Sequence, residues 1–145
     1  IDWINGSAKS TPVLSHTLVK HNVIPHLQQE NTVTFFVVID NLRYDQWKIL
    51  QPVISEYFNV ESDELYCGIL PTATQYARNA LFAGLMPLDI QKRYPGLWVG
   101  NNDEGGKNQH EETFIKDQLS RKGINTGCSY NKITNLGLGK KLYFA

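Results

Sequence analysis

Hydrophobic positions along the chain form short continuous runs that alternate with stripes at helical spacing. Residues 35–39, Phe-Phe-Val-Val-Ile, are continuously apolar and rich in β-branched and aromatic side chains. This composition is typical of a strand that is buried on both faces of a parallel sheet. Shorter runs over residues 65–70 and 124–130 predict two further strands.

Apolar residues that recur every three or four positions predict amphipathic helices over residues 44–54, 75–85 and 110–122. Gly84 and Gly123 stand where a glycine commonly ends a helix. Ser15 is placed to cap a shorter helix that runs to about residue 27, although Pro25 disfavours the second half of that helix. The polar residues 101–107 are predicted to be a loop.

Strands that alternate with helices of this length predict an α/β fold, with a parallel sheet flanked by helices. We expect an entry linker and short helix over residues 1–30, and one domain over residues 31–145. Ligands of such sheets bind beyond the carboxyl ends of the strands. Asp40 and the turn at residues 71–74 both follow predicted strands, so they are the first candidates for a site.

The charge balance, the length of the apolar runs and the cysteine spacing exclude several classes of protein. The chain has 145 residues, 14 basic and 14 acidic, so its formal net charge is zero. This balance argues against a protein that coats nucleic acids or membrane surfaces in general. The longest apolar run is too short to cross a bilayer. The two cysteines form no CxxC pair, so we expect a reduced, cytoplasmic setting. Because the chain begins at Ile1, we expect it to be part of a longer protein.

Several motifs agree in order with one known family. Residues 40–43 have the form Asp-x-x-Arg, and residues 71–74 read Pro-Thr-Ala-Thr. Residues 76–80, 104–108 and 129–135 read Tyr-Ala-Arg-Asn-Ala, Glu-Gly-Gly-Lys-Asn and Ser-Tyr-Asn-Lys-Ile-Thr-Asn. Together, the stretch from residue 37 to about 135 resembles the PglZ-type domain of the alkaline-phosphatase-like superfamily. Among PglZ proteins it is most similar to the PorX-like response regulators of type IX secretion.

The resemblance implies a partial alkaline-phosphatase-like domain and assigns roles to residues. Asp40 would be a metal ligand, and Thr74 would be the nucleophile that also contacts the metal. The metal would be zinc, which lowers the pKa of a coordinated oxygen from about 15 to about 7. Arg78 and Asn79 would contact a phosphate-ester or nucleotide-type substrate. The implied activity is hydrolysis of phosphoric esters, as the output domain of a two-component signalling protein.

One departure from the family pattern concerns the metal. The superfamily completes its metal centre with later Asp and His residues, and no Asp-x-x-x-His motif follows Tyr130. One carboxylate and one hydroxyl are too few ligands for a stable zinc site. We therefore expect this chain alone to bind metal poorly and to be inactive, with the remaining ligands supplied from outside it.

Other interpretations of the same residues stay open. Asp40 and Thr74 could each cap a helix, and Thr72 is a competing nucleophile. Arg78 could form a structural ion pair. The residues His110, Glu111 and Glu112 suggest a metal site, but an acidic pair that favours the helix dipole from the first turn explains them better. The rival function is a non-catalytic module that docks a sigma factor or a secretion component. A plain nucleotide-binding fold is less favoured, because no glycine-rich loop follows either strand.

Overall fold

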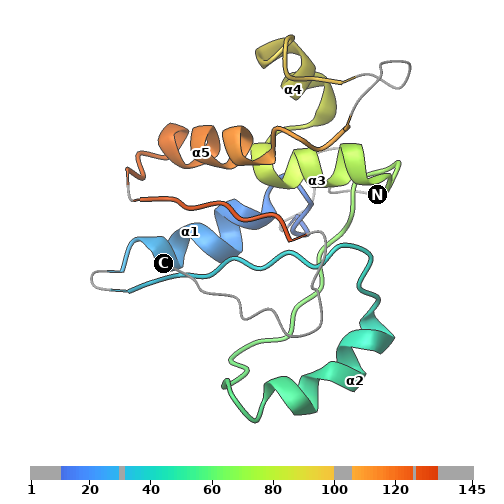
Figure 1. The fold of residues 1–145 in the computed structure, drawn as a ribbon, viewed down its shortest axis with the longest axis vertical. Helices are drawn as coiled ribbons and strands as arrows, with labels where there is room; N and C mark the ends of the chain where they lie inside the picture. The colour runs from blue at the N-terminus through green and yellow to red at the C-terminus, as the bar shows by residue number, and fades with distance from the viewer. Residues whose placement is uncertain (1–10, 30–31, 100–105, 126, 134–145) are drawn as a thin grey trace.

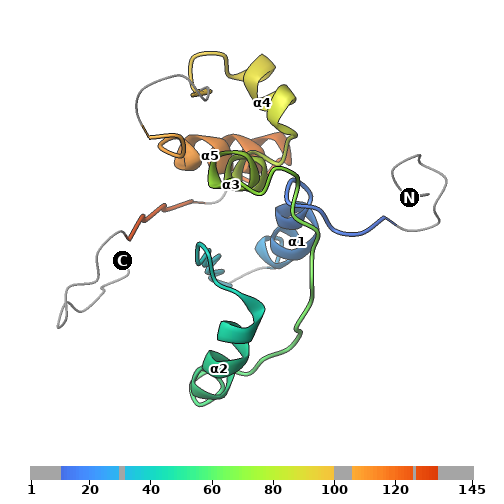
Figure 2. The ribbon, with the colours of Figure 1, turned by 90° about the vertical axis from the view of Figure 1, so that its right-hand side faces the viewer.

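The computed structural model describes residues 11–29, 32–99, 106–125 and 127–133. In chain order, the helices are η1 (Val19–Val23, a π-helix), α1 (Ile24–Leu27), α2 (Tyr44–Ile54), α3 (Thr74–Ala83), α4 (Pro87–Arg93) and α5 (Glu111–Arg121). Helices α3 and α5 lie side by side, with α4 against one side of the pair and α1 on the other (Figures 1 and 2). Helix α2 stands apart at the far end of the molecule.

The hydrophobic core lies mainly between α3 and α5. Phe114 of α5 is almost completely buried, and its ring packs against the ring of Tyr94 at 5.3 Å between centroids. The small residues Ala80 and Ala83 let α3 approach its neighbours closely. The buried apolar residues are Val19, Val23, Ile24, Ile69, Ala80, Leu81, Phe82, Ala83, Ile90, Phe114, Ile115 and Leu119.

The three long helices confirm the predictions made from apolar spacing. Helix α2 has the predicted bounds, while α3 begins one residue earlier than expected and α5 lies within the predicted range. Gly84 and Gly123 both have positive φ, 61° and 72°, as the ends of α3 and α5 require. Helix α4 was not predicted, although Pro87 at its start and Arg93 in its last turn are the usual signals of a helix.

The predicted helix over residues 15–27 needs correction. Ser15 does not cap it, since the helix begins after Leu18, and the Ser15 hydroxyl instead accepts a hydrogen bond from the Ile69 N–H at 3.2 Å. The N–H of Ile24 donates to the Val19 carbonyl five residues back, which is a π-helical bond. Pro25 stands in the first turn of α1, where a helix does not need its missing N–H, so the second half of the predicted helix does form.

Within the described ranges, the predicted strands appear as extended chain without a ladder. A single parallel bridge joins Leu14 to Cys67. Phe36 and Val38 pack against the core, whereas Phe35, Val37 and Ile39 are 65%, 74% and 57% exposed. The prediction that this run is buried on both faces is therefore wrong for the described structure, which covers one face only. The parallel sheet stays a prediction.

The predicted loop at 101–107 lies mostly outside the described residues. Among the helices that the structure describes, none combines the length and the apolar character that a membrane span requires.

Candidate functional site

Asp40 lies in a tight turn between the extended segment and α2. Asn41 adopts φ of 58°, a left-handed conformation that asparagine tolerates better than most residues, and the chain reverses there. Helix α2 has Arg43 as its N-cap, so Asp40 does not cap it. The Asp40 side chain is 52% exposed and is available to a ligand.

Thr74 is the first residue of α3. The N-cap is Ala73, which has extended ψ of 137° and makes no side-chain capping bond, so Thr74 is not the cap. Both Thr72 and Thr74 are exposed on the segment that follows the cis Leu70–Pro71 peptide bond. At this end of the helix the backbone dipole is positive, which favours an anion near Thr74.

Arg78 brings the two motifs together. It lies one turn after Thr74 on α3, and its Nη1 is 3.3 Å from Asp40 Oδ2. Its Nη2 donates to Glu111 Oε2 at 2.7 Å. Burial lowers the pKa of Arg78, but the charges and hydrogen bonds of Glu111 and Asp40 outweigh it, and the net pKa is raised. The structure thus places Arg78 in ion pairs, and its contact with a phosphate stays a prediction.

Glu111 is the polar centre of this region. Its side chain is completely buried, and it accepts hydrogen bonds from the Tyr130 hydroxyl at 2.6 Å and the Asn108 amide at 3.0 Å, besides the one from Arg78. Burial and the hydrogen bond to Glu111 raise the pKa of Tyr130 to about 12. Sequence reasoning missed this role, because the first-turn position of Glu111 in α5 also fits a simple dipole interaction. No local signal separates the two roles.

Two asparagines fasten the segment before α5 to α3. Asn108 donates to the backbone carbonyl of Thr74 at 3.1 Å. Asn79 is almost fully buried, and its amide donates to the Lys107 carbonyl at 3.1 Å. The proposed contact of Asn79 with substrate stays a prediction. Lys132 extends the same region, since its amino group donates to the Asn108 carbonyl at 3.3 Å.

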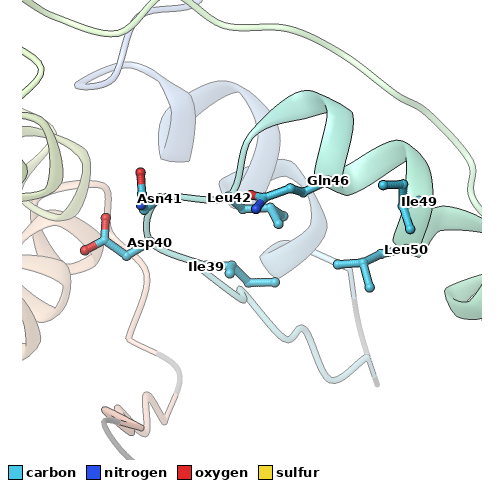
Figure 3. Close-up of a pocket in the computed structure, with 7 residues that line it drawn as sticks. All are labelled: Ile39, Asp40, Asn41, Leu42, Gln46, Ile49 and Leu50. Carbon is cyan, nitrogen blue, oxygen red and sulfur yellow. The ribbon is translucent and has the colours of Figure 1, made fainter.

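An open hollow lies between the Asp40 turn and α2, with a volume of about 470 Å³. Figure 3 shows Asp40 and Asn41 at one end and the side chains of α2 at the other. Its remaining lining is mainly apolar: Ile39, Leu42, Gln46, Ile49 and Leu50. The hollow therefore offers an apolar surface beside the Asp40 turn.

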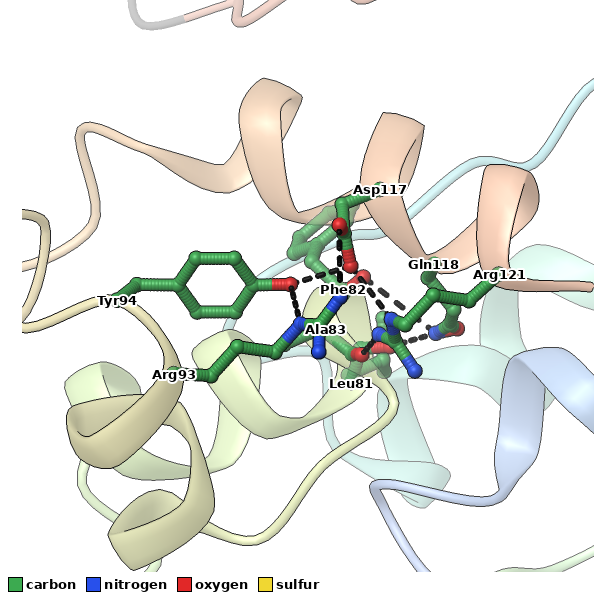
Figure 4. A network of polar contacts seen from close by, with 8 residues as sticks. All are labelled: Leu81, Phe82, Ala83, Arg93, Tyr94, Asp117, Gln118 and Arg121. Atoms are coloured by element: carbon green, nitrogen blue, oxygen red, sulfur yellow. Dashed lines mark hydrogen bonds and ion pairs between the residues drawn. The ribbon is translucent and has the colours of Figure 1, made fainter.

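A second polar network fixes the far end of the α3–α5 pair (Figure 4). The Gln118 amide donates to the Leu81 and Phe82 carbonyls at 3.2 and 3.4 Å, and Arg121 donates to the Ala83 carbonyl. These side chains of α5 satisfy carbonyls at the end of α3 that have no partner within the helix. They hold α3 at the end opposite Thr74.

The described residues do not complete a zinc site. Across the parts of the chain that the structure describes, no group of three or more His, Cys, Asp or Glu side chains is placed to hold a metal ion. A structural zinc site needs four such ligands and a catalytic one needs three. Asp40, which is ion-paired with Arg78, could supply only one of them.

The model of the BREX system PglZ alkaline phosphatase-like domain matches residues 18–143. No curated protein matches the chain. The matched residues include both the Asp40 turn and the start of α3.

Proposed function

The chain belongs to the PglZ family of alkaline phosphatase-like domains, and we propose that it forms part of a hydrolase of phosphoric esters with Thr74 as the nucleophile. The observation that carries this proposal is the ion pair between Arg78 and Asp40 at 3.3 Å. Because Arg78 lies one turn from Thr74 on α3, the pair brings together two motifs that are 34 positions apart. The ion pair links the helix that begins with Thr74 to the turn that carries Asp40, the residue proposed to hold the metal.

The chain's own residues would contribute to attack and to binding of the phosphoryl group. The Thr74 hydroxyl would lose its proton and its oxygen would form a bond to phosphorus, while the ester oxygen leaves and takes up a proton as the free alcohol. The product is a phosphothreonine, which still carries the second ester group when the substrate is a diester. Water would then hydrolyse this intermediate and restore Thr74. The positive end of α3 favours the negative charge of the phosphoryl group throughout.

We propose that Asp40 is one ligand of a zinc ion whose other ligands lie outside this chain. Zinc supplies activation of an oxygen nucleophile near neutral pH. The exposed carboxylate of Asp40 is compatible with that role. We propose zinc binding for the complete protein and not for this chain alone, because no Asp-x-x-x-His motif follows Tyr130 in the sequence.

The motifs favour phosphodiesters, such as nucleotide derivatives, over simple monoesters. We propose that the domain serves as the cytoplasmic output module of a two-component protein related to the PorX-like regulators of type IX secretion. The two free cysteines are compatible with a reducing compartment. Arg78 and Asn79 are proposed to contact the substrate, although their present partners are protein groups.

The test is hydrolysis of bis(4-nitrophenyl) phosphate by the complete protein, with zinc content measured on the same samples. We expect Thr74→Val to lower kcat by about 10³-fold or more, because the attacking oxygen is removed. Thr72→Val is the matched control, since it makes the same change two residues earlier on the same exposed segment. Equal losses in both variants, or turnover that survives Thr74→Val, would contradict the assignment.

A docking module is the second candidate function. It is supported by exposed apolar side chains next to the Asp40 turn, among them Ile39 and Ile49. Exposed apolar surface of this kind commonly binds another protein. A complete protein that contains no zinc and hydrolyses no ester would favour this function, with a sigma factor or a secretion component as the partner.

A further inference from the structure

Glu111 collects hydrogen bonds from three separate parts of the chain. Arg78 comes from α3, Asn108 from the segment before α5, and Tyr130 from the extended segment after α5. The Glu111 side chain has no exposed surface. Removing a carboxylate from water in this way is costly, and the cost is offset only where charged and polar donors surround it, as they do here.

Each oxygen of the carboxylate leads to a different candidate catalytic residue. Oε2 accepts from Arg78, whose other terminal nitrogen lies 3.3 Å from Asp40. Oε1 accepts from Asn108, whose amide nitrogen also donates to the Thr74 carbonyl at 3.1 Å. Glu111 is thus linked to Asp40 through the Arg78 side chain and to Thr74 through the Asn108 side chain.

We propose that Glu111 is a positioning residue, which holds Arg78 against Asp40 and Asn108 against the backbone of Thr74. This inference rests on the proposed function of Thr74 and Asp40. Catalysis depends on geometry so strongly that a displacement of about 1 Å can cost about 10²-fold in rate. A buried carboxylate that fixes two arms of the site is suited to prevent such a displacement.

The neighbouring carboxylate shows that a simple dipole role does not account for Glu111. Glu112 lies in the same first turn of α5, and it is exposed and paired with Lys116 at 2.6 Å. Both glutamates lie where a negative charge complements the helix dipole. Only Glu111 is buried and bonded to residues outside its own helix. Since buried ion pairs often add little net stability, placement of the partners is the better account of it.

The test compares Glu111→Gln with Glu112→Gln in the complete protein, with two measurements on each. The first is steady-state hydrolysis of bis(4-nitrophenyl) phosphate. We expect Glu111→Gln to lower kcat by about 10- to 100-fold, because the reacting groups are displaced, and to raise KM as well, because Arg78, which is proposed to contact the substrate, is no longer held in place. Glu112→Gln should match the parent. Equal kcat values in the two variants would overturn the inference.

The second measurement does not depend on activity. By NMR, the side-chain N–H signals of Arg78 should exchange slowly with water in the parent and in Glu112→Gln, and rapidly in Glu111→Gln. Unchanged exchange in Glu111→Gln would overturn the inference even in an active enzyme. If the complete, unsubstituted protein hydrolyses no ester, the proposed function is rejected, and the positioning role in catalysis is rejected with it. The exchange rates would then still show whether Glu111 orders the Arg78 side chain.

A second variant covers the case in which Glu111→Gln does not fold. Asn108→Ala removes the hydrogen bonds from Asn108 to Glu111 and to the Thr74 carbonyl, and leaves the Arg78 ion pairs in place. We expect a drop in kcat of about 10-fold, with KM unchanged. A folded Asn108→Ala protein with the kcat of the parent would contradict the Thr74 arm of the proposal.

Discussion

Gly84→Ala should destabilise the chain more than the same change at Gly123, although the two glycines have similar backbones. Gly84 ends α3 with φ of 61°, and Gly123 follows α5 with φ of 72°. Alanine in this left-handed region costs about 1–2 kcal/mol at either position. The surroundings differ, because a Cβ at Gly84 would lie 2.6 Å from the Gln118 amide, whereas a Cβ at Gly123 meets nothing within 4 Å.

The extra cost at Gly84 comes from displacing Gln118. This side chain is buried, and its amide bonds the carbonyls of Leu81 and Phe82 (Figure 4). Each lost hydrogen bond costs about 0.5–1.5 kcal/mol. We therefore expect a loss of about 2–5 kcal/mol in the free energy of unfolding for Gly84→Ala, against about 1–2 kcal/mol for Gly123→Ala.

Urea unfolding followed by far-UV circular dichroism measures both losses, provided that the m-value is unchanged. A double variant isolates the contact. In the Gln118→Ala background, Gly84→Ala should cost no more than the backbone term of about 1–2 kcal/mol. Equal losses at the two glycines, or a Gly84→Ala cost that is unchanged without Gln118, would refute the reasoning.

Three further predictions concern the core and the site. Phe114→Ala should lower the free energy of unfolding by about 3–5 kcal/mol in urea titrations, because it opens a cavity at a side chain that is 1% exposed. The control is Leu88→Ala, at a side chain that is 60% exposed, which should change the free energy of unfolding by less than about 0.5 kcal/mol. The Tyr130 pKa of about 12 exceeds the usual value near 10, so stability from this group is complete below pH 10 and is lost as pH rises towards 12. Unfolding measured across that range should show this loss in the parent and not in Tyr130→Phe, and identical pH dependence in the two proteins would contradict it. Asn41→Val should cost about 1–2 kcal/mol in thermal or urea unfolding because of its positive φ, while Asn41→Gly should be tolerated, and equal losses would argue against strain at this turn.

The sequence predicted what depends on neighbours along the chain. Apolar spacing and terminal glycines located α2, α3 and α5, since these signals lie within the helices themselves. The same local signals at Pro87 could have located α4. The Asp40 turn and the start of α3 were singled out through family motifs, and the ion pair from Arg78 places them together.

The sequence could not predict contacts between distant residues. Arg78 and Glu111 are 33 positions apart, and nothing in either segment marks the other as its partner. The prediction that residues 35–39 are buried on both faces was wrong for a related reason. A run of apolar residues does not indicate which of its faces is covered. Its exposed face, with Phe35 and Val37, depends on what packs there, which local composition cannot specify.

Helices α3 and α5 are joined at both of their ends. Asn108, just before α5, donates to the carbonyl of Thr74 at the start of α3, and Gln118 and Arg121 of α5 hold the last residues of α3. Contacts at one end alone would let α3 rotate relative to α5, whereas contacts at both ends make the two helices move together. A displacement of the final turn of α5 would therefore be transmitted through α3 to Thr74, the proposed nucleophile.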